Sequence, residues 1–172
     1  MHFIYKIACV IWIGLSDIIY AIDISGLYLT HKGTEGGRSV VEIFEYNGKY
    51  YIYGLKNLEA EPIFDSCNKN PDLRKRKSVG NVFGYGYKEN KKGYFVGGHI
   101  YNFYNCKTYY GKIVPKGNGK ICFVGALDSY YIFSRSYKWQ KLTPEQTRQY
   151  EAYRIPLKEI ITTIDDAIRS KK

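Results

Sequence analysis

Residues 91–101 read KKGYFVGGHIY, and this stretch decides between two folds. From Lys92 onward, the run Lys-Gly-Tyr-Phe-Val is typical of the strand in an RNA-recognition domain on which bases stack. Taken as an alternating pattern, the same residues form one strand of a β-barrel, with two small residues at a bend. The first interpretation predicts a nucleic-acid-binding protein, and the second predicts a closed barrel.

The rest of the chain favours the barrel. Asn47-Gly48 is a strong signal for a type I′ hairpin turn, and residues 89–93 and 115–119 are further polar hairpin loops with glycine. No segment between Gly26 and Trp139 has helical periodicity, whereas an RNA-recognition fold interleaves helices with its strands. The sequence therefore predicts an all-β, eight-stranded antiparallel up-and-down barrel that binds no nucleic acid. The expected strands are residues 26–32, 39–46, 49–56, 79–88, 93–103, 107–114, 120–126 and 129–138.

The first 21 residues have the pattern of a secretory signal peptide. Residues 1–6 carry one positive charge, residues 7–15 are almost wholly apolar, and the small residues Ser16 and Ala21 follow. We expect cleavage after Ser16 or after Ala21, with an uncleaved anchor as the alternative. The charge-free run is shorter than the roughly 20 residues of a spanning helix. The sequence thus predicts a secreted or periplasmic protein, a monomer with no stable membrane insertion after cleavage.

The C-terminal residues change to a helical pattern after Lys141. Residues 143–146, Thr-Pro-Glu-Gln, supply an N-cap, a proline in the first turn and a capping-box glutamine. From Leu157 onward, apolar residues recur at helical spacing and form one stripe, which we expect to pack on the outside of the barrel rather than on a membrane. The expected domains are a signal peptide at 1–21, the barrel at 22–141 and C-terminal helices at 142–172.

The composition suits a single domain with an anionic partner. The chain has 172 residues and a formal net charge of +10, although a basic, ordinarily solvated surface explains that charge as well. No nucleotide-binding loop or nucleophile-elbow motif occurs, and the two histidines after residue 21 are too few for a metal cluster. We therefore expect a protein that is not an enzyme, with no catalytic residue, no cofactor and no metal site.

The start of the first strand resembles the lipocalins. In that family a Gly-x-Trp motif opens the first strand, and an arginine of the last strand packs over its aromatic ring. Gly26-Leu27-Tyr28 resembles this motif, with Arg135 as the matching arginine in the segment that ends at Trp139. The resemblance implies that Gly26, Tyr28, Arg135 and Trp139 close one end of the barrel, with a cation–π contact between Tyr28 and Arg135.

The chain is also similar, from Gly26 to Trp139, to a family of small exported bacterial domains of unknown function. The matching segments include residues 47–49, 70–72, 97–101 and 107–109, whereas Asn102-Phe103 stands where that family usually has Asp-Pro. The resemblance implies export and a lipocalin-like barrel, and it carries no biochemical activity over to this chain.

One long connection, residues 58–78, interrupts the short turns. Connections of this length are often lids or binding loops, and this one contains Cys67 and the basic run of residues 74–77. Strand direction in the barrel places Cys67 and Cys106 at the open end and Cys122 near the closed end. We therefore expect a Cys67–Cys106 disulfide, Cys122 as a buried free thiol, and a loop that arches over the open end.

The functional hypothesis concerns the interior of the barrel. Eight strands enclose a space that is filled by side chains or holds one small ligand, and the sequence does not say which strand faces lie inside. Tyrosines suit an amphipathic guest, and arginines at the mouth suit an acidic head group. We predict a binding protein for a small apolar or amphipathic, anionic molecule; the alternative is a surface-interaction protein with a filled barrel that binds a host or envelope partner. The candidate ligand-binding residues are Tyr53, Tyr85, Tyr94, His99, Tyr101, Tyr109, Arg74 and Arg76.

Overall fold

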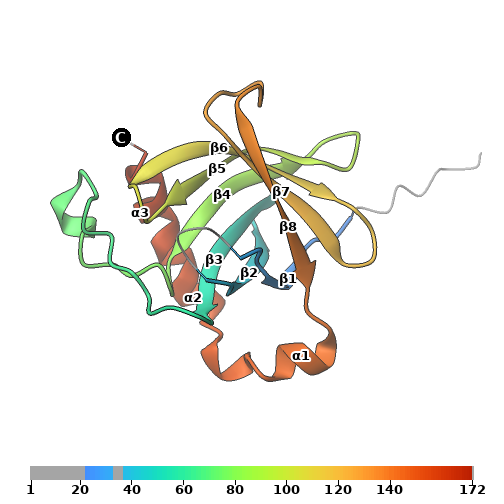
Figure 1. The fold of residues 1–172 in the computed structure, drawn as a ribbon, viewed down its shortest axis with the longest axis horizontal. Coiled ribbons are helices and arrows are strands. Elements are labelled where there is room, and N and C mark those ends of the chain that lie inside the picture. Colours follow the sequence, from blue (N-terminus) through green and yellow to red (C-terminus); the bar gives the residue numbers. More distant parts are fainter. Residues whose placement is uncertain (1–21, 33–36, 172) are drawn as a thin grey trace, which may run out of the picture.

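The computed structural model describes residues 22–32 and 37–171, and the predicted signal peptide lies outside them. Eight antiparallel strands form a closed barrel in chain order (Figure 1), which confirms the predicted fold class. The strands are β1 (Gly26–Leu29), β2 (Ser39–Tyr46), β3 (Lys49–Asn57), β4 (Val82–Glu89), β5 (Phe95–Asn102), β6 (Lys107–Pro115), β7 (Lys120–Ala126) and β8 (Ser134–Lys141).

The barrel closes through a short seam between β1 and β8. Only two pairs join these strands in the described residues, Tyr28 with Lys141 and Leu29 with Gln140. β1 ends at Leu29, earlier than the predicted residue 32, and β8 from Ser134 to Trp139 is paired with β7 only. The seam is therefore the place where the fewest residue pairs join two neighbouring strands of the barrel.

The last strand begins at Ser134 and not at the predicted residue 129. The carboxylate of Asp128 accepts hydrogen bonds from the backbone N–H groups of Tyr130, Ile132 and Phe133, at 2.9, 3.2 and 2.9 Å. A short acidic side chain that binds its own downstream backbone holds a turn. The apolar run after Asp128 is therefore a loop, although its composition is that of a strand.

Large side chains fill the inner side of the barrel. Tyr28, Tyr87, Phe95, Phe123 and Trp139 belong to one cluster, and none of them is more than 6% exposed. The rings of Phe123 and Trp139 stack with their centroids 4.4 Å apart. This part of the barrel is a packed core of large side chains.

The C-terminal helices cover the outer face of β2, β3 and β4. Ile160, Ile164 and Ala167 are buried there in a second core cluster with residues of the strands, such as Leu55 and Val82. This confirms the predicted packing, and Figure 1 shows α3 lying beside the barrel wall. The helical elements are η1 (Pro71–Leu73), α1 (Pro144–Arg148), η2 (Glu151–Tyr153), α2 (Leu157–Ile160), η3 (Ile161–Thr163) and α3 (Ile164–Arg169).

Two further features of the C-terminal segment follow from its sequence. The predicted capping box is present, because the side chains of Thr143 and Gln146 each bind the other's backbone N–H. None of the helices within the described ranges is long and apolar enough to cross a membrane.

Candidate functional site

The predicted ligand-binding tyrosines do not converge on one cavity. Tyr53 and Tyr85 are buried under the C-terminal helices on the outer side of the barrel, and Tyr94 is partly exposed at the start of β5. The Tyr53 hydroxyl donates to Glu42 at 2.6 Å, and the Tyr109 hydroxyl accepts from the Asn105 amide at 2.9 Å. Because side chains alternate between the two faces of a strand, Tyr53 and Tyr85 lie on the face opposite to the inner core.

His99 also faces the outer side of the barrel. Its ring stacks on Tyr85 with the centroids 5.5 Å apart, and its Nε2 lies 3.0 Å from Nζ of Lys171. Burial lowers the pKa of His99, and the positive charge of Lys171 lowers it further. The ring is therefore neutral near pH 7 and can accept a hydrogen bond from Lys171, which fastens the end of the chain to β5.

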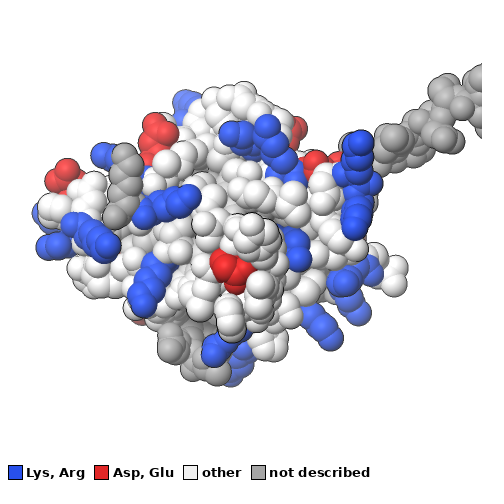
Figure 2. Space-filling model, turned by 90° about the horizontal axis from the view of Figure 1, so that it is seen from above, with Lys and Arg blue, Asp and Glu red and all other residues white. Residues whose placement is uncertain are grey.

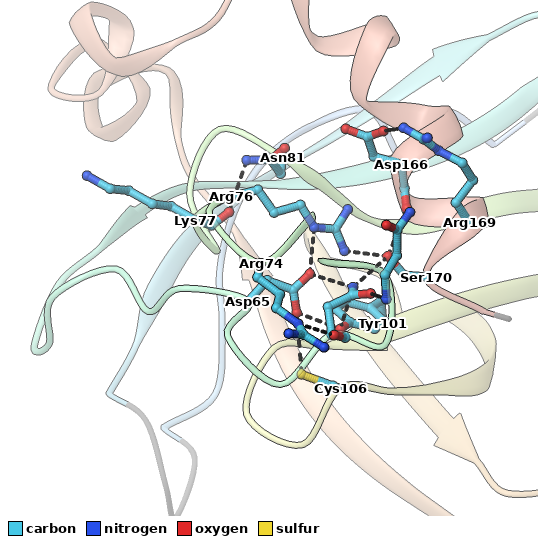
Figure 3. A network of polar contacts seen from close by, with 12 residues as sticks. Asp65, Arg74, Arg76, Lys77, Asn81, Tyr101, Cys106, Asp166, Arg169 and Ser170 are labelled. Carbon is cyan, nitrogen blue, oxygen red and sulfur yellow. Dashed lines mark hydrogen bonds and ion pairs between the residues drawn. The ribbon is translucent and has the colours of Figure 1, made fainter. Parts of the chain in front are cut away.

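The long loop folds against the outer wall and does not arch over the open end. Its Asp65 is fully buried, and Arg76 Nε lies 2.7 Å from Asp65 Oδ2 (Figure 3). The other oxygen of Asp65 accepts from the Tyr101 hydroxyl at 2.5 Å, and Arg76 Nη2 donates to Ser170 Oγ at 2.6 Å. A buried carboxylate requires a paired charge, and Arg76 supplies it.

The prediction that Arg74 and Arg76 stand at the rim of a ligand cavity is therefore wrong. Arg76 is buried in the network that joins the loop, β5 and the C-terminus, and Arg74 Nε donates to the backbone oxygen of Asn68 at 2.9 Å. The Asn68 side chain itself donates to Asp65 at 2.8 Å. Both arginines hold the loop together.

The predicted disulfide between Cys67 and Cys106 is present, with the two Cα atoms 5.7 Å apart. It ties the long loop to the β5–β6 turn, and Cys106 Sγ lies 3.4 Å from Asp65 Oδ1. Cys122 is free, as predicted, but it is half-buried rather than buried. It points away from the inner core, on the side of β7 opposite Ile121 and Phe123.

The predicted contact between Tyr28 and Arg135 is wrong. Tyr28 is buried opposite Lys141, near Gly26, and its hydroxyl donates to the Ile24 oxygen at 2.9 Å. Burial raises the pKa of Tyr28 to about 12. Arg135 is exposed and pairs with Gly125 at the other end of β8, roughly 20 Å from Lys141 along the strand. Trp139, and not Arg135, shares the inner core with Tyr28.

A groove of about 610 Å³ lies along the seam between β1 and β8. Leu29, Ile121 and Trp139 give it an apolar floor. No acidic residue lines it among those that the structure describes, whereas cationic residues surround the floor. These are Lys32, Arg38, Lys116, Lys120 and Lys138.

The pairing of β7 with β8 places these groups on one outer surface. Lys138 is opposite Cys122, and Lys120 is opposite Gln140, so their side chains alternate with the inward-facing Trp139. The C-terminal helices cover the wall of β2, β3 and β4, and they leave this surface open. The groove exists because the short seam leaves the end of β1 apart from most of β8.

Two of the cations are already paired, and three are available. Glu59 accepts from Arg38 at 2.8 Å and lies 3.3 Å from Lys32 Nζ. Lys116, Lys120 and Lys138 have no ion-pair partner in residues 22–32 and 37–171. Sequence reasoning missed this cluster because its members are single lysines spread over a hairpin and β8, whereas the contiguous basic run at 74–77 drew attention. The available signal was that Lys120 and Lys138 each stand directly beside an apolar residue that faces the core, Ile121 and Trp139.

No group of three His, Cys, Asp or Glu side chains that could hold a metal ion occurs within the described residues. The chemistry that the groove offers is therefore apolar contact combined with positive charge.

The closed eight-stranded barrel with C-terminal helices is the architecture of lipocalin-like proteins. Residues 26–141 match the family described as "Uncharacterized protein conserved in bacteria (DUF2147)", and the chain belongs to this family. It is also similar to the solved structure titled "Protein HP1028 from the human pathogen Helicobacter pylori belongs to the lipocalin family". The two chains are 33% identical with a TM-score of 0.78, over 83% of this chain and 99% of that chain. No curated protein matches the chain.

Proposed function

We propose that this protein is an exported binding protein, without catalytic activity, for a small amphipathic anion. We place the ligand in the groove at the β1–β8 seam rather than inside the barrel. The observation that carries this proposal is the position of Lys116, Lys120 and Lys138 around an apolar floor that includes Trp139. The volume of the groove lies within the usual range of small-molecule sites, about 300–1,000 Å³.

The two parts of the groove suit the two parts of such a ligand. An acyl chain that lies against Leu29 in the groove takes its own apolar surface out of water, which contributes roughly 25 cal/mol per Å². A carboxylate beside the lysine ammonium groups forms charge-assisted hydrogen bonds. Because the groove is open to solvent along the barrel surface, it fits an extended chain better than a compact ring system.

Export is supported by the sequence and by the disulfide. Residues 1–21 have the order of a signal peptide, and the Cys67–Cys106 bond suits an oxidising compartment. The lipocalin-like architecture and the membership of a bacterial family agree with a small exported binding domain.

Trp139 makes the proposal testable without a label, because it is the one tryptophan of residues 22–172. The exported form should be titrated with decanoate and with decanol while the Trp139 fluorescence is recorded. We expect decanoate to bind roughly tenfold or more tightly than decanol, because one charge-assisted hydrogen bond contributes about 1.5–3 kcal/mol.

A triple variant distinguishes the effect of the three groove lysines from the effect of the protein's overall positive charge. Lys116→Gln, Lys120→Gln and Lys138→Gln together should remove most of the preference for decanoate. The control, Lys88→Gln, Lys91→Gln and Lys92→Gln, loses the same charge at the exposed β4–β5 turn and should keep the preference. Equal affinity for acid and alcohol in the unaltered protein would contradict the role of the lysines, and no binding of either would contradict the site.

A further inference from the structure

The loop between β7 and β8 presents an exposed apolar tip. Leu127, Tyr130, Ile132 and Phe133 are 70%, 85%, 72% and 71% exposed. Single exposed apolar residues are ordinary on a protein surface, but large ones that lie together mark an interaction site. In Figure 1 this loop rises from the barrel on the side away from α1.

Internal hydrogen bonds hold the loop that carries this tip. Asp128 binds three backbone N–H groups of the loop, and Leu127 N donates to Phe133 O at 3.0 Å. The Tyr131 hydroxyl donates to the Gly111 oxygen at 2.9 Å, and Lys112 Nζ lies 4.4 Å from the centre of the Tyr131 ring. The apolar side chains are thus displayed by an ordered loop, which lowers the entropic cost of binding through them.

The strands that carry the tip are strongly basic. Residues 107–141 contain seven Lys and Arg residues and one acidic residue, Asp128. The carboxylate of Asp128 accepts hydrogen bonds from three backbone N–H groups of the loop, which leaves seven cationic residues against one carboxylate in this part of the chain. Figure 2 views the molecule from above Figure 1, the side from which the loop rises, and many Lys and Arg side chains surround an area there that is uncharged apart from one acidic group near its centre.

We propose that the tip and the basic outer surface of β6, β7 and β8 dock on an anionic lipid bilayer. Tyr130, Ile132 and Phe133 enter the head-group region, and lysines such as Lys112 and Lys138 contact lipid phosphates. An anionic bilayer supplies both an apolar phase and negative charge, and peripheral binding needs both signals. A second copy of this chain would present the same positive charge and be repelled. Lys138 also lines the groove, whereas the apolar tip lies outside it, so docking does not depend on a ligand in the groove.

Sedimentation with vesicles tests the proposal on the processed, exported protein. Vesicles of phosphatidylcholine alone are compared with vesicles in which one lipid in three is phosphatidylglycerol. We expect binding to the anionic vesicles, little binding to the neutral ones, and loss of binding as salt rises. The double variant Tyr130→Ser and Phe133→Ser should bind the anionic vesicles at least roughly tenfold more weakly, because each ring no longer leaves water.

A matched control removes apolar groups elsewhere. Leu157→Ser and Ile168→Ser alter two exposed apolar residues of the C-terminal helices and should leave vesicle binding unchanged. Decanoate binding by the Tyr130→Ser, Phe133→Ser variant should also be unchanged, which separates docking from the groove. Equal binding to both kinds of vesicle, or undiminished binding by the tip variant, overturns the proposal. So does a dimer of the unaltered protein that the tip variant converts to a monomer, since the tip would then join two copies.

Discussion

The ring of Tyr87 in β4 fills the space that Gly98 leaves on the neighbouring strand β5. A Cβ atom on Gly98 would lie 2.3 Å from Cδ1 of Tyr87, and one on Gly111 would lie 2.3 Å from the Tyr87 hydroxyl oxygen. Tyr87 has no exposed surface, and burial raises its pKa well above the ordinary value. Gly98, the last glycine of KKGYFVGGHIY, therefore makes room for a side chain of the core, and not for a ligand.

This packing predicts that Gly98→Ala destabilises the barrel. The added methyl group overlaps a ring that is enclosed by the inner core, so we expect a loss of about 1–3 kcal/mol in the free energy of unfolding. Denaturant unfolding followed by circular dichroism measures the loss. Gly125→Ala is the control, because its Cβ would meet only Ile100 Cγ2 at 3.9 Å. If the two variants are equally stable, Tyr87 does not fill the space beside Gly98 in solution.

The disulfide predicts a second stability difference. The bond joins residues 39 positions apart, and closing a loop of that length in the unfolded chain is worth about 4 kcal/mol in the chain-entropy model. Replacing Cys67 and Cys106 by serine should therefore lower the free energy of unfolding by several kcal/mol. Cys122→Ser, outside the bridge, should cost much less, and comparison of the melting temperatures distinguishes the two cases.

Local rules and strand direction were enough to predict most of the fold. Alternation and hairpin turns gave the strands, the Thr143–Gln146 capping box gave the start of α1, and strand direction in a closed barrel brought Cys67 to Cys106. These features depend on residues close in sequence or on the order of strands, so they can be predicted from the sequence alone.

The candidate site could not be predicted in the same way. Which face of β3 lies inside depends on what covers the other face, and the C-terminal helices bury Tyr53 on the outside. The path of the long loop depends on Asp65, which binds Arg76 of the same loop and Tyr101 of β5, and on Arg76, which in turn binds Ser170 near the C-terminus. A basic run in the sequence shows its charge but not the carboxylate that pairs with it.

The buried pair of Asp65 and Arg76 predicts an unequal effect of two similar substitutions. Arg76→Gln leaves the carboxylate of Asp65 buried without its cation, and we expect a loss of about 3–5 kcal/mol in the free energy of unfolding. Arg74→Gln removes one hydrogen bond to a backbone oxygen from an exposed residue, and about 1 kcal/mol is expected. Urea unfolding of the two variants compares these losses. Equal losses would show that Arg76 acts at the surface, as a ligand-contacting residue would.

The buried tyrosines predict that the fold weakens in alkali. Burial raises the pKa of Tyr28 and of Tyr85 to about 12 from an ordinary value of 10.0. Burial also raises the pKa of Tyr53 and Tyr101, and their bonds to Glu42 and Asp65 raise it further. Between pH 10 and 12 the unfolded chain releases tyrosine protons that the folded chain retains, so the free energy of unfolding falls as pH rises. The stabilisation is complete below pH 10.

Tyr85→Phe isolates one of these groups. The Tyr85 hydroxyl is buried and has no hydrogen-bond partner among the described residues, so its removal should cost little stability at pH 8. The variant should lose less stability than the unaltered protein between pH 9 and pH 12, because one linked proton is gone. Urea unfolding at several pH values, with tyrosinate absorbance recorded in parallel, measures both quantities. An unchanged pH dependence in the variant would mean that Tyr85 titrates alike in the folded and unfolded chains, and that the C-terminal helices do not shield it from water.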